Sequence, residues 1–565
     1  MTIVETVERT DVLEFRKDVP VRMSDGITLR ANVFLPLKPG RYPVVLSYGV
    51  YGKDVHFCDG FKPQWEILNR LYPGLATDGS TGRFLRWETA DPERWVPDGY
   101  VLVSVDGRGS GKSEGFLDPF SSRETTDYAE IIEWAAAQGW STDKVGLLGV
   151  SYFAMKQWQV AALRPPHLAA IVPWEGASDI YREWARHGGI LSNSFTEGWL
   201  PRQVLVNQHG NGDSPLRDPD TGERTTGPAR EPGILAGSIA PFMEELRAHA
   251  LDDAWYEQRC GRLEAIDVPI LSAGNWGGPA LHLRGNVEGF LRAGSKQKWL
   301  SMHIGTHYES FYLPEYVAMQ KRFFDRFLKD IDNGFDQEPP VRVVIRRPDG
   351  SEVRTDTAWP LRATEWTRLY LDAGSESLGF EAPTAGASAV FDAGDGEVTF
   401  RTDPFERETE FTGPVALKLF AASTTTDLDL FVTLRLFGPE GKEVRFVGAH
   451  EEVPVARGWL RASQRRLDAE KSLPYRPYLT HDRIEMLTPG EVTELDVEVW
   501  PTSIVCPPGY TLCLTVAGRD FQYETPGRML HNDPTDRPDG VFSGRTTLHT
   551  GGDRQSYLLM PQQPR

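Results

Sequence analysis

One stretch, Asp143-Lys-Val-Gly-Leu-Leu-Gly-Val-Ser-Tyr-Phe-Ala154, constrains the fold of this chain more than any other. Its apolar run, residues 145–150, predicts a short buried strand. After Ser151, apolar residues continue at helical spacing until Pro165-Pro166, where a helix has to end. The stretch therefore predicts a strand and a helix joined by a tight turn, with a serine at the apex of the turn.

A strand, a serine turn and a helix in this order are typical of the nucleophile elbow of α/β-hydrolases. The sharp turn lifts the Ser151 hydroxyl clear of the sheet, and the N–H groups at the start of the helix face a developing oxyanion. The usual pattern is G-x-S-x-G, and this chain has Phe153 at the second glycine position. An ordinary strand-to-helix turn is the alternative, so the interpretation needs support from the rest of the chain.

Further apolar runs predict the other strands of one sheet, at residues 42–48, 100–105, 168–174, 268–274 and 298–304. Helical patterns lie between them, one after a capping box at Ser121-Ser-Arg-Glu124 and another over residues 317–329. Strands that alternate with helices predict a mainly parallel α/β sheet. The Asp25-Gly26 pair between alternating runs predicts a hairpin before it.

The glycine-rich turn Asp106-Gly-Arg-Gly-Ser-Gly-Lys-Ser-Glu-Gly115 raises a nucleotide-binding alternative. Lys112-Ser113 is present, but the glycine spacing is one residue shorter than that of a phosphate-binding loop. A tight turn shaped by its glycines is therefore the favoured interpretation.

The sheet pattern stops between residues 178 and 264, where helical pieces surround a polar loop at 210–233. This insertion predicts a helical cap with a mobile lid, and a surface decoration is the alternative. Beyond residue 339, short alternating strands with Gly and Pro turns predict an all-β jelly-roll domain. The expected organisation is an α/β-hydrolase core at 1–177 and 265–338, a helical cap at 178–264 and the jelly roll at 339–565.

Charge and cysteine content exclude several classes of partner. Sixty-one Lys and Arg against 80 Asp and Glu give a net charge of -19 without a basic stretch, which argues against nucleic acid and anionic membranes. The four cysteines lack metal-binding spacing and predict free thiols, and the start of the chain has no apolar signal segment. We expect a cytoplasmic protein without metal or organic cofactor, and the sequence leaves a homo-oligomer open.

His307 follows the last predicted core strand, so Ser151 and His307 stand in the chain order of the α/β-hydrolase triad. The histidine would take the serine proton and return it to the leaving group. His303 and His282 are the competing candidates, and His303 fits a role within the strand.

With these features the chain resembles the cocaine-esterase-like and X-Pro dipeptidyl-peptidase-like serine hydrolases, the CocE/NonD type. The glycine-rich turn at 106–115 is similar to the family's D-x-R-G-x-G-x-S-x-G, and residues 149–154 are similar to its G-x-S-Y-x-G elbow. Tyr51-Gly-Lys53 resembles a family segment whose tyrosine hydroxyl helps to form the oxyanion hole. Asp427-Leu-Asp429 and the segment at 458–463 resemble motifs of its jelly roll. The resemblance implies an oxyanion hole made by the Tyr51 hydroxyl and the Tyr152 backbone N–H.

The expected triad acid departs from this resemblance. Where the family has an aspartate after the strand at 268–274, this chain has Gly278. We place the acid on Glu175, the first residue beyond the neighbouring strand, because both strands end at the same edge of the sheet. The alternatives are Asp179, Asp267, Glu309 or no acid at all.

The sequence thus predicts a serine hydrolase that cleaves a small ester or amide through an acyl-enzyme. The predicted catalytic residues are Ser151, His307 and Glu175. An X-Pro dipeptidyl-peptidase is one alternative, and an inactive member that binds through its jelly roll is another. Esters are favoured over peptides because Phe153-Ala154 offers no carboxylate to hold a substrate amine.

Overall fold

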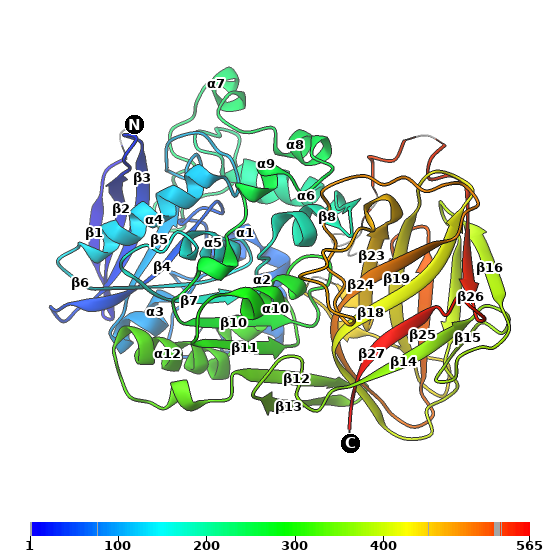
Figure 1. Cartoon of the computed structure of the whole chain (residues 1–565). Coiled ribbons are helices and arrows are strands. Elements are labelled where there is room, and N and C mark those ends of the chain that lie inside the picture. Colours follow the sequence, from blue (N-terminus) through cyan, green and yellow to red (C-terminus); the bar gives the residue numbers. More distant parts are fainter. Residues whose placement is uncertain are drawn as a thin grey trace.

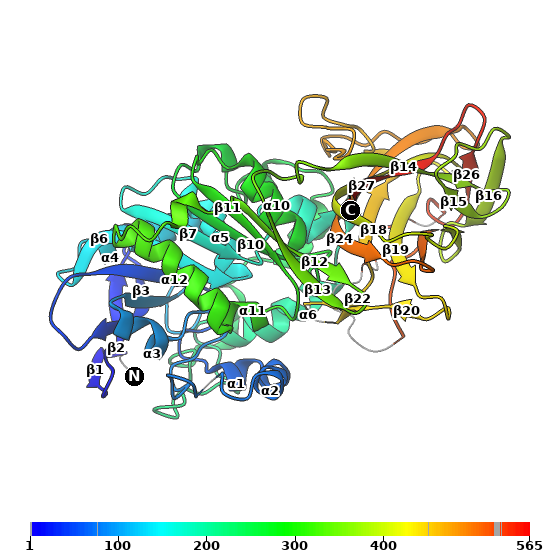
Figure 2. The ribbon, with the colours of Figure 1, turned by 90° about the horizontal axis from the view of Figure 1, so that it is seen from below.

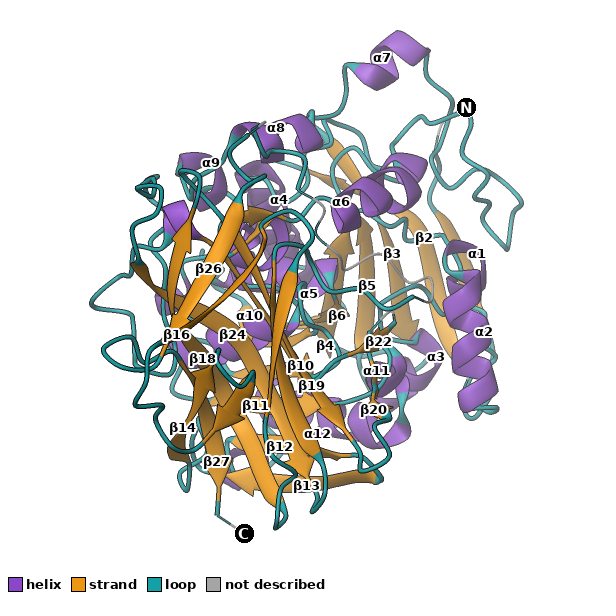
Figure 3. Cartoon of the chain, turned by 90° about the vertical axis from the view of Figure 1, so that its right-hand side faces the viewer, coloured by secondary structure: helices purple, strands orange, loops and turns teal. Residues whose placement is uncertain are grey.

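The computed structural model describes residues 3–75, 77–449, 451–524, 532, 534–538 and 540–564. Figure 1 shows two large units side by side, a sheet flanked by helices in the N-terminal part of the chain and a strand-rich C-terminal unit. Figure 3 looks at the molecule from the C-terminal side, with orange strands in front and most of the helices behind them. The site described below belongs to the first unit.

The first sheet has eleven strands in the order β1-β2-β3-β5-β4-β6-β7-β10-β11-β12-β13. The seven strands from β5 to β12 in this order run parallel. The strands are β1 (Thr6–Arg9), β2 (Leu13–Arg22), β3 (Thr28–Pro36), β4 (Tyr42–Gly49), β5 (Val101–Asp106), β6 (Ser141–Val150), β7 (Leu168–Trp174), β10 (Ile270–Asn275), β11 (Lys298–His303), β12 (Val341–Arg347) and β13 (Gly350–Asp356). The predicted hairpin is the antiparallel pair of β2 and β3.

Helices cover both faces of this sheet. The helices of the first unit are α1 (Phe57–Gly60), α2 (Lys62–Leu71), α3 (Pro92–Trp95), α4 (Ser122–Ala136), α5 (Tyr152–Ala161), α10 (Leu283–Arg292), α11 (Glu309–Tyr312) and α12 (Pro314–Leu328). On β6, Val145 and Leu147 pack in one apolar cluster with residues of α4 and α5, whereas Leu148 and Val150 pack in another with Phe324 of α12. Figure 2 shows α12 crossing the sheet when it is viewed from below. Burial on both faces explains why β6 is a continuous apolar run.

The predicted insertion contains short helical pieces and one small hairpin. They are a π-helix (Tyr181–Ala185), the hairpin β8 (Arg186–His187) and β9 (Ile190–Leu191), α6 (Ser194–Trp199), a second π-helix (Leu200–Val204), α7 (Pro232–Ala236), α8 (Phe242–Ala248) and α9 (Ala254–Glu257). Arg284 of α10 is buried and ion-paired with Glu183 of the insertion and with Glu498 of the C-terminal unit. The insertion and the C-terminal unit therefore both pack against the first unit.

The C-terminal unit is all-β, and its hydrogen-bonded path closes because β27 pairs with both β14 and β18. Its strands are β14 (Glu365–Asp372), β15 (Ser377–Gly379), β16 (Ala387–Asp392), β17 (Glu397–Arg401), β18 (Thr409–Ser423), β19 (Asp429–Phe437), β20 (Glu443–Val444), β21 (Phe446–Val447), β22 (Glu452–Val453), β23 (Ala456–Arg461), β24 (Thr493–Cys506), β25 (Thr511–Ala517), β26 (Arg545–Thr550) and β27 (Tyr557–Gln563).

The change from one sheet to the other comes later than residue 339, where the sequence placed it. β12 pairs in parallel with β11, and β13 pairs with β12, so both extend the first sheet. The short run of β-branched residues in β12 suits either sheet, and only the partner strand decides between them.

Two further features concern the cysteines and the helices. All four cysteines are described, and all are free thiols. Within the described residues, no helix is both long and apolar enough to span a bilayer.

Candidate active site

Ser151 occupies the predicted turn between β6 and α5. Its φ of 56° and ψ of -115° lie outside the usual regions for a residue with a side chain, as expected for a strained functional turn. The Ser151 N–H donates to the carbonyls of Trp174 and Glu175, at 3.1 Å each, which fixes the turn to the end of β7. The turn also requires Gly149, because a Cβ there would lie 2.4 Å from the Cβ of Phe153.

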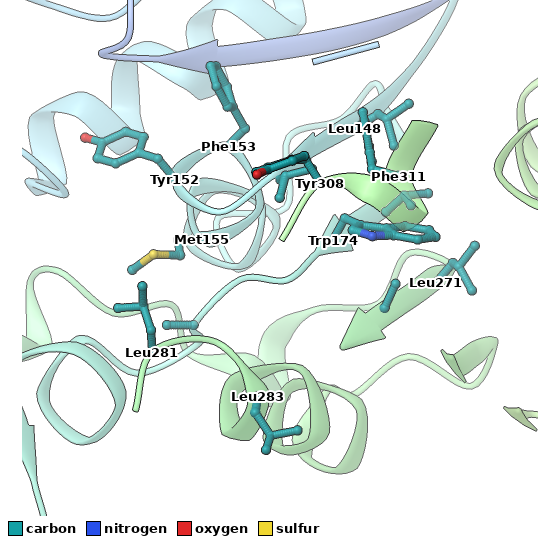
Figure 4. Packing of buried hydrophobic residues seen from close by; sticks show 14 of the residues in the cluster. Leu148, Tyr152, Phe153, Met155, Trp174, Leu271, Leu281, Leu283, Tyr308 and Phe311 are labelled. Atoms are coloured by element: carbon teal, nitrogen blue, oxygen red, sulfur yellow. The ribbon is translucent and has the colours of Figure 1, made fainter. Parts of the chain in front are cut away.

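Aromatic side chains surround this turn (Figure 4). Tyr152 and Phe153 project from the first turn of α5, and Trp174 lies on the neighbouring strand β7. Phe153, which replaces the second glycine of the usual elbow pattern, packs edge-on against the Tyr51 ring at 5.7 Å between centroids. Phe153 in place of this glycine is thus compatible with the turn, and its ring packs beside it.

Glu175 lies directly beyond β7 and is fully buried. Its Oε2 is 2.8 Å from Nδ1 of His307, and its Oε1 is 2.8 Å from Nε2 of His303 and accepts from Nδ2 of Asn275 at 3.3 Å. Burial by itself raises the pKa of Glu175, but the charge of His307 and the two imidazole hydrogen bonds outweigh it and hold the pKa below its usual value. Glu175 is therefore a buried carboxylate kept ionised by its partners.

His307 lies in the loop after β11, between two carboxylates. Besides the bond from Nδ1 to Glu175, its Nε2 lies 3.1 Å from Oε1 of Glu88. Burial lowers the pKa of His307, yet the two carboxylates overcome this and raise it to about 9. Burial raises the pKa of Glu88 to about 7, with His307 acting in the opposite direction and Glu175 adding to the rise. At neutral pH the row from Glu175 through His307 to Glu88 thus holds an imidazolium.

His282 is the histidine for which a hydrogen bond to Ser151 is found, with 3.1 Å between Ser151 Oγ and His282 Nε2. It occupies the N-cap position of α10, at the end of the loop that follows β10. Its ring stacks on that of His307, with 5.0 Å between centroids and 10° between planes. Two buried imidazoles therefore lie beside one serine.

The predicted oxyanion groups lie at the same place. The Tyr51 hydroxyl accepts a 2.9 Å hydrogen bond from the indole N–H of Trp199, which is in α6 of the insertion. Burial and the nearby Glu88 raise the pKa of Tyr51 far above its usual value, and hydrogen bonds with Trp199 and Ser151 act against this rise. The hydroxyl is thus a neutral donor at any working pH. Tyr152 is the first residue of α5, where backbone N–H groups have no acceptor within the helix.

The structure brings Glu175 and His307 together, and it places Tyr51 at the Ser151 turn. The alternative acids have partners elsewhere: Asp179 pairs with Arg182, Asp267 with Arg164, and Glu309 accepts from Tyr72. The sequence reasoning did not identify Glu88, which lies in a long loop without periodic pattern and is separated from His307 by 219 positions. No sequence signal marks it. The catalytic roles of these residues stay predictions.

One group within the described residues has the spacing of a metal site. The donor atoms of His56, Cys58 and Asp59 lie within 4.8 Å of one another. His56 already caps α1 by accepting from the Cys58 N–H at 3.1 Å, and its other ring nitrogen bonds to the carbonyl of Gly82. The arrangement is explained as a helix cap, and it is not part of the site around Ser151.

Comparison with known proteins gives one consistent result. Residues 25–309 match the family model of the X-Pro dipeptidyl-peptidases (S15 family), and residues 333–559 match that of the X-Pro dipeptidyl-peptidase C-terminal non-catalytic domain. A CocE/NonD family hydrolase from Staphylococcus aureus has a similar structure, with a TM-score of 0.84 and 35% identity over 97% of this chain and 94% of that one.

Two more distant proteins agree with this result. The cocaine esterase of a Rhodococcus strain is 23% identical, over 96% of this chain and 98% of its own length. An aminopeptidase from a marine sediment archaeon, Thaumarchaeota archaeon, shares the fold, with a TM-score of 0.70 and 17% identity over 99% of this chain and 98% of that one.

Proposed function

The chain belongs to the X-Pro dipeptidyl-peptidase (S15) family and is a serine hydrolase, and we propose that it cleaves small carboxylic esters through an acyl-enzyme on Ser151. The observation that carries the proposal is the buried hydrogen bond between Glu175 and His307 at the edge of the sheet where the Ser151 turn lies. In this proposal the parallel sheet is an α/β-hydrolase core, the insertion is its cap, and the C-terminal sheet is a jelly roll.

Each proposed role follows from a contact in the site. Ser151 Oγ attacks the ester carbonyl carbon, and the alcohol leaves with a proton. The negative charge that develops on the carbonyl oxygen is stabilised by two donors, the Tyr51 hydroxyl and the Tyr152 N–H. Glu175 fixes the tautomer of His307 and stabilises it when it is charged, as the acid of a triad does. The Glu175–His307 pair is the proposed acid–base unit of hydrolysis.

An ester substrate is supported more strongly than a peptide. Recognition of a free α-ammonium requires a carboxylate that the protein does not already use. Glu88 is the additional carboxylate in the site, and its Oε1 is already bonded to His307. An X-Pro dipeptidyl-peptidase activity is the second candidate, and Glu88 is the observation that favours it. An inactive binding protein is less well supported, because the buried carboxylate–histidine pair is present without the usual aspartate.

The first test is Ser151→Ala with a panel of acyl p-nitrophenyl esters and X-Pro p-nitroanilides. We expect wild-type protein to hydrolyse the esters faster and the variant to lose several orders of magnitude in kcat/KM, because only the nucleophile is removed. Circular dichroism and the thermal unfolding midpoint should match those of wild type. Retention of most ester activity by the variant would exclude Ser151 as the nucleophile, and faster hydrolysis of X-Pro amides would favour the peptidase.

A further inference from the structure

The loop that follows β10 contributes a different kind of side chain to the site from the aspartate that the sequence resemblance implies. Gly278 stands at the position where the triad acid is expected. The carboxylate that is hydrogen-bonded to His307 is instead that of Glu175, after β7. Four residues beyond Gly278 the same loop supplies His282, which is 1% exposed and lies at the nucleophile. The loop therefore contributes an imidazole to the site in place of a carboxylate.

His282 is in direct contact with the reacting atom. Its Nε2 is 3.1 Å from Ser151 Oγ, a normal distance for a hydrogen bond from a hydroxyl to an imidazole nitrogen. The backbone holds the residue in place, since the His282 N–H donates to the carbonyl of Gly278 at 3.2 Å and the residue begins α10. The parallel ring of His307 lies against its face. Both the distance and the buried position suit proton transfer from the serine.

The ring nitrogens of His307 have different partners from those of His282. Its two ring nitrogens face the carboxylates of Glu175 and Glu88, at 2.8 and 3.1 Å. A neutral imidazole has one donor and one acceptor nitrogen, and a ring between two ionised carboxylates donates from both. To take a proton, His307 has first to release one, and Glu88 has to give up its bond to Nε2.

We propose that His282 is a second catalytic histidine, which takes the proton of Ser151 as the acyl-enzyme forms, whereas the Glu175–His307 pair activates the water that hydrolyses it. The inference rests on the proposed function, because it needs Ser151 as the nucleophile. It divides between two imidazoles the work that a single histidine does in a Ser-His-Asp triad.

The proton count balances in both half-reactions. In the first, the Oγ–H proton moves to Nε2 of His282, the bond from Oγ to the carbonyl carbon forms, the ester C–O bond breaks, and His282 gives the proton to the departing alkoxide. In the second, the Nε2 proton of His307 first moves to Oε1 of Glu88, and the neutral His307 then takes a proton from water as the water oxygen bonds to the acyl carbon. When the C–Oγ bond breaks, His307 gives that proton to Oγ of Ser151 and takes its own proton back from Glu88. Both histidines end the cycle as they began it.

The experiment separates the two half-reactions. A fluorophosphonate probe reacts with an activated serine but is not released by hydrolysis, so its labelling rate reports only the first. Steady-state hydrolysis of p-nitrophenyl acetate reports both. The variants are His282→Gln and His307→Gln, in which an amide keeps hydrogen-bonding capacity but cannot carry a proton. His167→Gln is the matched control, because this histidine is half-exposed and paired with Glu133. It precedes the first residue of β7, whereas the Ser151 turn adjoins the last one.

We expect His282→Gln to lower the labelling rate by about 10²- to 10⁴-fold, the usual contribution of a general base. His307→Gln should label within about tenfold of wild type but lose turnover by a similar 10²- to 10⁴-fold factor. Labelling of His282→Gln at the wild-type rate would overturn the proposal, and so would a loss of labelling in His307→Gln equal to that in His282→Gln. If His282→Gln loses secondary structure, His282→Asn replaces it in the labelling experiment. Free imidazole should also restore labelling of His282→Ala, which would not happen if His282 had only a structural role.

Failure of this proposal is distinguishable from failure of the proposed function. If Ser151→Ala still reacts with the probe, Ser151 is not the nucleophile and both fall. If Ser151→Ala is unreactive and His282→Gln labels normally, the serine hydrolase stands and His307 serves both half-reactions.

Discussion

At the scale of single residues, the carboxylate that contacts His307 follows a different strand from the one that the sequence resemblance implies. Glu175 follows β7, whereas the expected position, Gly278, lies in the loop after β10. The two strands are parallel neighbours, with Trp174 in register with Ala273, and the Glu175 N–H donates to the Ala273 carbonyl at 2.7 Å. A carboxylate at the end of either strand can therefore reach the loop after β11. Asn275, at the end of β10, donates to Glu175.

Replacing Glu175 by Gln tests this position. We expect kcat to fall by about 10²- to 10⁴-fold, because the amide cannot balance the charge of His307 or fix its tautomer. KM should change less. The measurement is steady-state ester hydrolysis, with Asp267→Asn as the control, since Asp267 is exposed and paired with Arg164. A near-normal kcat with intact folding would remove Glu175 from the catalytic group.

The protonation of His307 should appear in the stability of the protein. Burial opposes its charge, but Glu175 and Glu88 raise its pKa from 6.5 to about 9. Because the folded-state pKa is the higher one, the stabilisation is complete below about pH 6.5 and disappears as the pH rises towards 9. Its size is on the order of 3 kcal/mol. The gap in thermal unfolding midpoint between wild type and His307→Gln should narrow from pH 6.5 to pH 9. A gap that is constant over this range would contradict the assigned charge.

At the scale of elements, the insertion contacts the predicted oxyanion donor. α6 places Trp199, which is completely buried, so that its indole N–H donates to the Tyr51 hydroxyl. Tyr51 itself lies beyond β4, in the loop that leads to α1. A hydroxyl that already accepts one hydrogen bond is directed to donate its own proton, and here it faces Ser151. The insertion thus orients a side chain of the first unit.

Trp199→Phe tests this link between the insertion and the first unit. Removal of the indole N–H should lower kcat by about 2- to 10-fold, the effect expected for one hydrogen bond of about 0.5–1.5 kcal/mol. KM should change little, because the charge on the oxyanion develops only towards the transition state. Steady-state kinetics give both constants, and Trp366→Phe, in the C-terminal sheet and partly exposed, is the matched control. An effect on KM alone would make Trp199 a substrate-binding residue.

At the scale of the whole molecule, the C-terminal unit is in contact with the loops that follow β10 and β11. Ala449, between β21 and β22, donates its N–H to the carbonyl of Gly277 at 2.7 Å. Its own carbonyl accepts from the His307 N–H at 3.1 Å. One residue of the β unit is therefore bonded to the loop after β10 and to the loop after β11. These loops supply the two histidines of the site.

A pair of neighbouring glycines tests this contact. A Cβ on Gly277 would lie 2.6 Å from the carbonyl oxygen of Val447 and 2.7 Å from Gly448 Cα, so Gly277→Ala has to push the two units apart. A Cβ on Gly278 would meet nothing closer than 3.4 Å, so Gly278→Ala is the control. We expect Gly277→Ala to lower kcat by about 10- to 100-fold, because small displacements of catalytic groups are costly. Equal kinetics for the two variants would mean that the contact does not position the histidines.

The sequence determined the features that depend on neighbours along the chain. The apolar run before Ser151, the amphipathic run after it and the glycine at 149 specify a strand, a turn and a helix within about twenty residues, and local propensity and periodicity are sufficient for that. Chain order then indicated Ser151 and His307, and the parallel direction of neighbouring strands suggested Glu175.

Only the tertiary structure decided which groups meet across long separations. Glu88 and His307 are 219 positions apart, and His282 and Ser151 are 131 apart. Their contacts depend on how loops with no periodic pattern pack over the sheet edge, and no local rule encodes such packing. The same holds for β12, which joins the first sheet because β11 is its partner, although its β-branched residues suit either sheet. Side-chain pattern determines the type of an element, and packing determines its partner.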